Sequence, residues 1–203
     1  MDNNKLISLE EAKNILKFAK RIYRALDGVT VEYGDIFAYY PNELRITIPE
    51  EFHDTDQGMS ILSHVNREFN ATFEYNLREM SIQAFCHEMG HHMDFEGKIF
   101  TNRIYDYMEA DDYNRGLYQE ACKEFTNKVN DFYDKLDEYK MGPEDNDELG
   151  FELEMKQMEL EKEDEALDIL YRLIPTEYAA DEFSARFFMT YLKPYKKCNY
   201  NVL

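Results

Sequence analysis

The first part of the chain alternates apolar and polar residues at the spacing of an amphipathic helix. The apolar residues that would form one face of this helix are Ala12, Ile15, Leu16, Ala19, Ile22, Tyr23 and Leu26. Ser8 and Glu11 form a capping-box pattern at its start, and Asp27-Gly28 supplies a stop signal. The pattern therefore predicts a helix over residues 9–26.

A different pattern follows, rich in β-branched and aromatic residues. Segments 29–33, 36–40 and 44–48 are separated by short turn-forming stretches, and the last of them alternates cleanly between apolar and polar residues. We expect these segments to form a three-stranded antiparallel meander. Residues 58–69 are predicted to be helical, and residues 71–75 to form a short edge strand.

Helical patterns dominate the rest of the chain. A helix is predicted over residues 78–96, ended by Gly97, and a Tyr-rich, charged helix over residues 103–140, with a break near Gly116. The next helix is expected over residues 151–174. It carries an apolar residue every seven positions, at Leu153, Leu160, Leu167 and Ile174.

These two long segments would pair as an αα-hairpin. Pro175-Thr176 then opens a last helix, which runs to Met189, and the basic tail 193–197 is expected to be irregular. The predicted fold is α+β and mainly helical, with a small antiparallel sheet packed on the helix 78–96. At 203 residues, the chain suits a single domain, residues 1–203, that contains segment 101–174 as an acidic helical insertion.

The chain is acidic, with a formal net charge of −19. Between residues 131 and 165 there are 15 acidic and 4 basic residues, a net charge of −11. Such a run is either a solvated helix face or a surface for a basic partner. Direct binding to nucleic acid or to an anionic membrane is disfavoured, because phosphates would be repelled.

Aromatic residues make up 15% of the chain, which argues against disorder. The three scattered cysteines do not form a disulfide framework, so a reducing, cytoplasmic setting is expected. The N-terminus shows no secretory pattern, and no stretch is apolar enough to span a membrane.

The candidate chemistry lies in the helix 78–96, where residues 87–91 read His-Glu-Met-Gly-His. His87 and His91 stand four residues apart, so both imidazoles lie on one helix face and can bind one Zn²⁺ at about 2.0–2.1 Å. Glu88 can then reach a water on the metal and act as general base. Cys86 points away from this face and is interpreted as a small core residue.

A catalytic zinc site needs a third protein ligand. Glu177 is the best candidate, because a carboxylate on an otherwise apolar helix is costly to bury unless it is paired or binds a metal. Asp181, four residues later, shares its face and could accept the ring N–H of a zinc-binding histidine. The alternative is that both acids only favour the helix N-terminus, and Glu109 or Glu120 could be the ligand instead.

This HExxH motif followed by a Glu-x-x-x-Asp helix resembles the gluzincin arrangement of zinc peptidases. Residues 177–189 are similar to a conserved run of ImmA/IrrE-like metallopeptidases, which are common in phages and mobile elements. The resemblance covers residues 5–97 and 175–192. It implies a zincin-like fold with His87, His91 and Glu177 as zinc ligands. One departure is large, since 86 positions separate His91 from Glu177.

The resemblance implies a zinc-dependent endopeptidase that cleaves an intracellular protein, with Glu88 as the base. An edge strand would hold the peptide, and a Tyr or His would stabilise the oxyanion. The alternative function is an acidic binding or inhibitor protein on a zincin scaffold, which binds a basic partner or mimics DNA. A second alternative is an inactive precursor whose insertion blocks the cleft. A basic protein docking on segment 101–174 is the expected partner.

Overall fold

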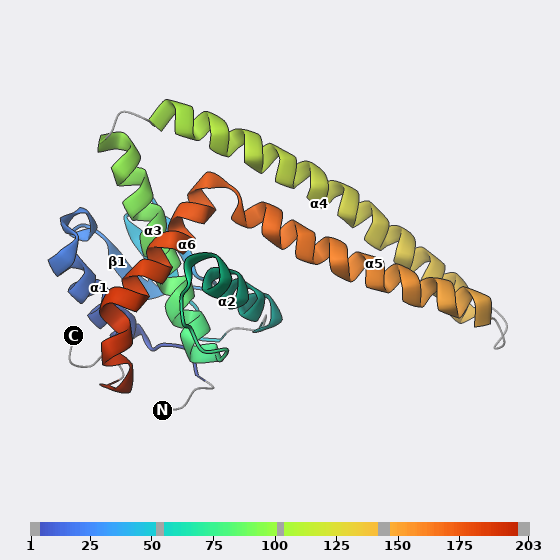
Figure 1. The fold of residues 1–203 in the computed structure, drawn as a ribbon, viewed down its shortest axis with the longest axis horizontal. Helices are drawn as coiled ribbons and strands as arrows, with labels where there is room; N and C mark the ends of the chain where they lie inside the picture. The colour runs from blue at the N-terminus through green and yellow to red at the C-terminus, as the bar shows by residue number, and fades with distance from the viewer. Residues whose placement is uncertain (1–4, 52–54, 101–103, 142–146, 199–203) are drawn as a thin grey trace. The chain divides into compact units, whose positions relative to one another are not determined.

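Helices and one small sheet make up the chain (Figure 1). The structure is a computed structural model and describes residues 5–51, 55–100, 104–141 and 147–198. The longer elements are α1 (Leu9–Ile22), β1 (Thr30–Tyr33), β2 (Ala38–Tyr40), β3 (Arg45–Ile48), α2 (Thr55–Phe69), α3 (Leu77–Phe100), α4 (Ile104–Met141), α5 (Asp147–Arg172) and α6 (Pro175–Phe187). The predicted α+β class with mainly helical content is confirmed.

Two compact units divide the chain. The first comprises residues 1–104 and 178–203, and the second comprises residues 105–177. The second unit coincides closely with the acidic segment 101–174 that the sequence sets apart. Helix α6 belongs to both units, because the boundary falls between Glu177 and Tyr178.

Helix α1 is fixed at its start by the predicted capping box. The Ser8 hydroxyl accepts the Glu11 backbone N–H, and the Glu11 carboxylate accepts the Ser8 backbone N–H. Glu11 is also paired with the buried guanidinium of Arg78 on α3. In addition, the Ile7 backbone N–H donates to the Ser81 hydroxyl at 2.9 Å. These contacts anchor α1 to the helix that carries the HExxH motif.

The sheet is mixed, so the predicted antiparallel meander is wrong. The strand order is β1-β3-β2, with β1 parallel and β2 antiparallel to β3. Strand β3 lies in the centre and is the most buried of the three. The link from β1 to β2 passes over the end of β3 at Gly34, where an added Cβ would lie 2.7 Å from Thr47.

The predicted edge strand 71–75 is also absent. The side chain of Asn66, on α2, accepts the Phe73 backbone N–H and donates to the Phe73 carbonyl, both at 2.9 Å. The backbone groups of Phe73 are thereby paired with a side chain instead of a neighbouring strand. Helix α2 itself agrees with the predicted helix 58–69.

The remaining helices agree with the prediction except at their ends. Helix α3 continues through Gly97 to Phe100, and α4 runs unbroken through Gly116. One glycine costs about 1 kcal/mol in a helix, which is too little to break helices of this length. The tail after α6 is not irregular: a π-helical turn (Phe188–Leu192) and a 3-10 helix (Lys193–Cys198) follow.

The core of the first unit lies between the sheet and its helices. Fully buried side chains include Ile15 of α1, Ile46 and Ile48 of β3, Phe85 of α3, and Phe188 just beyond α6. Phe73 and Phe188 stack with ring centroids 4.0 Å apart. Across the described residues, none of the helices is both long and apolar enough to traverse a membrane.

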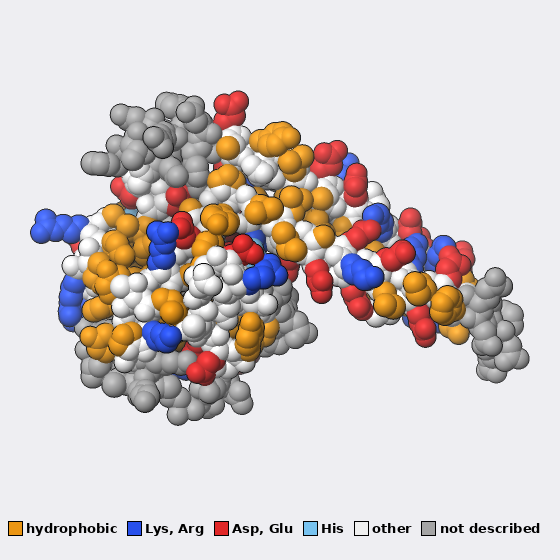
Figure 2. Space-filling model, viewed as in Figure 1, with side chains coloured by type: hydrophobic (Ala, Val, Ile, Leu, Met, Phe, Trp, Pro, Cys, Tyr) orange, Lys and Arg blue, Asp and Glu red, His pale blue; other side chains and the backbone are white. Residues whose placement is uncertain are grey.

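The second unit is a pair of antiparallel helices, α4 and α5 (Figure 1). Lys128 of α4 pairs with Glu163 of α5, and Lys135 pairs with Glu152, both at 2.7 Å. On the face shown in Figure 2, acidic side chains lie along these helices with hydrophobic ones between them. The unit therefore has a two-helix seam and an acidic surface.

Candidate metal centre

Helix α3 brings the three residues of the motif together. One ligand atom from each of His87, Glu88 and His91 lies within 4.8 Å of the other two. The two imidazole rings have centroids 4.6 Å apart and are nearly perpendicular. His87 is buried, whereas Glu88 and His91 are half-buried. The i, i+4 spacing thus brings the two imidazoles together on one helix face, and the Glu88 carboxylate lies beside them.

Asp181 holds His87 in one orientation. Its Oδ1 atom lies 2.8 Å from His87 Nδ1, and Asp181 is fully buried. A carboxylate is an acceptor, so His87 Nδ1 carries the hydrogen and Nε2 is the nitrogen that would bind a metal. The structure therefore gives Asp181 the contact that the sequence predicted for it, with His87 as the histidine concerned.

Two further residues hold the Asp181 carboxylate and its helix. Gln83 Nε2 donates to Asp181 Oδ1 at 3.2 Å, and the Ser184 hydroxyl donates to the Asp181 carbonyl at 2.8 Å. Sequence reasoning missed both. Gln83 precedes His87 by four residues, so its place on the same helix face was the available signal.

Helices α3 and α6 touch at Gly90. A Cβ added there would lie 2.7 Å from the Ala180 Cα and 2.8 Å from the Ala180 carbonyl oxygen. Gly90 lies between the two motif histidines, and Ala180 directly precedes Asp181. The missing side chain of Gly90 therefore allows the backbone approach that brings Asp181 to His87.

His92 has a structural role. Its Nε2 bonds the Ala25 carbonyl at 2.8 Å, and its Nδ1 accepts the Tyr39 hydroxyl at 2.6 Å. Both ring nitrogens are used, so His92 faces away from the motif cluster, as expected from its place beside His91. Burial, and then the carboxylate of Glu96, raise the pKa of Tyr39.

Cys86 is fully buried in the core of the first unit. Burial raises the pKa of its thiol well above the ordinary value of 9.0, so the side chain is a protonated thiol at neutral pH. A metal ligand would have to be the thiolate. The interpretation of Cys86 as a core residue is therefore confirmed.

Glu177, in the second unit, is a buried carboxylate with polar neighbours. Arg115 donates to its Oε1 at 3.1 Å, and the Tyr171 hydroxyl hydrogen-bonds to it. Burial, and then the charge of Glu177, raise the pKa of Tyr171. Arg115 also pairs with Asp111 at 2.7 Å. No sequence pattern indicated Arg115, which stands 62 residues before Glu177.

The predicted site residues therefore fall into two groups. His87, Glu88, His91 and Asp181 lie together in the first unit. Glu177 belongs to the second unit, and its ligation of a metal stays a prediction. Its burial, at 3% exposure, sets it apart from the other candidates, Glu109 and Glu120, which are both exposed.

The donor set of the first unit fits zinc. Zinc accepts imidazole nitrogens at about 2.0–2.1 Å, and His87, Glu88 and His91 form a group that could hold a metal ion. The hydrogen bond from His87 to a carboxylate is the support that zinc-binding histidines receive in proteins. Comparison of the chain with protein-family models, with curated proteins and with solved structures gave no match.

Proposed function

We propose that this protein is a zinc-dependent endopeptidase that hydrolyses a peptide bond in another protein. The observation that carries the proposal is the convergence of His87, Glu88 and His91 within 4.8 Å. His87, through Nε2, and His91 would hold the zinc, and Glu177 would supply the third ligand. Zinc bound there would polarise a peptide carbonyl and lower the pKa of a coordinated water to about 7.

Glu88 is the residue that moves the proton. It is half-buried beside His87, and it takes part in none of the ion pairs among the described residues. By contrast, Asp181 is bonded to His87, and Glu177 is paired with Arg115. Glu88 is thus the carboxylate suited to accept a proton from the attacking water and pass it to the leaving amine.

Asp181 and Gln83 are positioning residues in this proposal. Asp181 keeps the Nδ1 hydrogen on His87, so that Nε2 stays unprotonated and can bind the metal. Gln83 holds the same Asp181 oxygen at 3.2 Å. Both are buried, which keeps the arrangement fixed when substrate enters and leaves.

The resemblance to ImmA/IrrE-like metallopeptidases of phages and mobile elements supports the choice of substrate. In that setting the protein would act in the cytoplasm on a protein regulator. The gluzincin pattern, HExxH followed by the Glu177–Asp181 pair, supports hydrolysis by a zinc site with an open position over a closed structural one.

The proposal is tested with Glu88→Gln, which keeps the shape of the side chain and removes the base. We expect the variant to bind zinc like the wild type and to have a peptidase activity at least about 100-fold lower. Activity is measured by digesting a peptide library with the zinc-loaded protein and identifying the products by mass spectrometry.

Glu96→Gln is the matched control, because Glu96 is an exposed acid on the same helix. It should cleave the same peptides as the wild type. Equal cleavage by wild type and Glu88→Gln would remove Glu88 from the mechanism, and no cleavage by the zinc-loaded wild type would reject the peptidase.

A further inference from the structure

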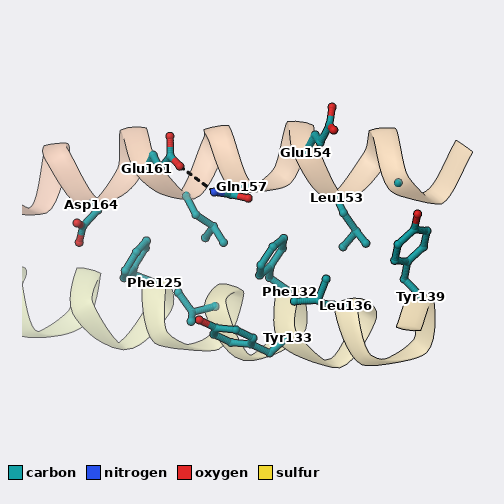
Figure 3. A pocket seen from close by; sticks show the side chains of 13 residues that line it. Phe125, Phe132, Tyr133, Leu136, Tyr139, Leu153, Glu154, Gln157, Glu161 and Asp164 are labelled. Carbon is teal, nitrogen blue, oxygen red and sulfur yellow. Dashed lines mark hydrogen bonds between the residues drawn. The ribbon is translucent and has the colours of Figure 1, made fainter. Parts of the chain in front are cut away.

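The seam between α4 and α5 opens on one side into a groove of about 720 Å³ (Figure 3). Its floor is apolar and comes from both helices: Phe125, Phe132 and Leu136 from α4, and Leu153 and Leu160 from α5. In Figure 3, Phe125 and Phe132 point toward α5, and Leu153 points toward α4.

Ion pairs outside the groove join the two helices. Lys128 bonds both carboxylate oxygens of Glu163, and Lys135 bonds Glu152. None of these four residues lines the groove. The lysines that join the two helices therefore lie outside the groove lining.

The open edge carries acids without cations. Glu154, Glu161 and Asp164 of α5 line it, and in the described part of the chain no lysine or arginine forms an ion pair with them. Gln157 donates to Glu161 at 3.1 Å, which is a hydrogen bond within the same helix. These three acids, called the acidic rim below, thus offer negative charge to a molecule outside the hairpin.

The apolar floor is incompletely covered. Apart from Leu153, its residues are half-buried, and Tyr133 on the α4 side of the groove is 58% exposed. Two helices cannot enclose an apolar seam by themselves, and a further element packed along it would remove this surface from water. The groove therefore has the shape that a third helix packed against α4 and α5 would fill.

We propose that this groove binds a basic amphipathic helix of a partner protein. The apolar face of that helix would cover Phe132, Leu136 and Leu160, and its Lys and Arg side chains would reach Glu154 and Glu161. From Phe125 to Tyr139 the groove follows α4 for about 21 Å, so a helix of about four turns fills it. The proposal is independent of zinc and of peptidase activity.

The negative charge of the second unit favours a basic helix over other binding partners. Residues 105–177 contain 23 acidic and 8 basic residues. A nucleic acid would be repelled, and so would a second copy presenting the same acidic rim. An extended strand has little to bond, because the backbone groups of the lining residues are used within α4 and α5.

The probe is a synthetic 14-residue peptide of Leu and Lys with leucines at helical spacing, labelled with fluorescein. Its binding to the full-length protein is measured by fluorescence anisotropy, with a scrambled peptide of the same composition as reference. Reversing the rim charge with the double change E154K and E161K should weaken binding about tenfold. The matched change E159K and E165K alters two exposed acids of α5 outside the groove. It should change the affinity for the peptide by less than about twofold.

A second pair of variants tests the apolar contact. Tyr133→Ala removes a ring from the groove and should weaken binding about fivefold. Tyr113→Ala removes an exposed ring elsewhere on α4 and should not. Equal losses in the two charge variants, equal binding of the scrambled peptide, or no binding would overturn the proposal. A dimer of the protein alone that Tyr133→Ala dissociates, seen by sedimentation, would assign the groove to a second copy instead.

Discussion

Asp181 determines which nitrogen of His87 is available to a metal. Its carboxylate accepts the Nδ1 hydrogen at 2.8 Å, and it is itself held by Gln83. An ionised carboxylate in a fully buried position is costly unless its oxygens are bonded, so these contacts are needed for the residue to be there at all. The hydrogen bond to His87 offsets the desolvation cost of the Asp181 carboxylate only while the imidazole ring stays in place.

Replacing Asp181 by Asn tests this role. The amide keeps the size of the side chain but loses the charge that favours the Nδ1 hydrogen, so we expect zinc affinity to fall about 10- to 100-fold. The measurement is a competition titration against a chelating dye. Glu182→Gln, at the next position of α6, is the control and should bind zinc as the wild type does, because Glu182 pairs with Arg186. Unchanged affinity in Asp181→Asn would show that the His87 contact does not tune the metal.

Some residues of the site could be predicted from spacing and others could not. His87, Glu88 and His91 follow from the helical repeat, and Asp181 follows from its place four residues after Glu177 on the same helix face. Gln83 could have been found in the same way. Arg115 and Tyr171 could not, because their contacts with Glu177 join helices that are far apart in sequence.

At the scale of elements, the contact between α3 and α6 sets the geometry of the centre. The two helices approach at Gly90 and Ala180 so closely that a Cβ on residue 90 would meet backbone atoms at 2.7 and 2.8 Å. Backbone atoms of a packed helix cannot move aside as a flexible side chain can. Any enlargement of residue 90 must therefore separate the helices.

Gly90→Ala is expected to destabilise the protein by about 1–3 kcal/mol, although alanine favours helix over glycine. The same change at Gly97, on the same helix, meets nothing within 4 Å and should stabilise the protein by up to about 1 kcal/mol. Urea unfolding of both variants measures the difference. Stabilisation by Gly90→Ala would mean that α3 and α6 are farther apart than described.

Element positions were predictable to different degrees. The helices follow from periodicity, and the hairpin of α4 and α5 follows from the seven-residue spacing of Leu153 and Leu160. The order of the strands did not follow, because the prediction paired consecutive strands, whereas β3 pairs with both β1 and β2. The absent strand 71–75 reflects the side-chain bonds of Asn66, which no strand pattern encodes.

At the scale of the whole molecule, charge and chemistry lie in separate units. Residues 105–177 contain 23 acidic and 8 basic residues, whereas the rest of the chain contains 19 and 15. The first unit holds the histidine cluster, and the second holds the acidic groove. The proposed zinc chemistry and the proposed partner groove thus belong to different units.

Glu177 is the predicted third zinc ligand. It lies in the second unit at the boundary with the first, one helical turn before Asp181. Zinc binding would stabilise the native chain by about 2.7 kcal/mol at a free zinc concentration of a hundred times its Kd.

Zinc titration of the metal-free protein, in competition with a chelating dye, tests the account most directly. We expect the wild type and Glu120→Ala to bind one zinc ion per chain with the same affinity. Glu177→Ala should bind about 100-fold more weakly, because it lacks one of three protein ligands. Loss of affinity in Glu120→Ala alone would move the third ligand to that residue. A wild-type protein that takes up no zinc would contradict the metallopeptidase itself.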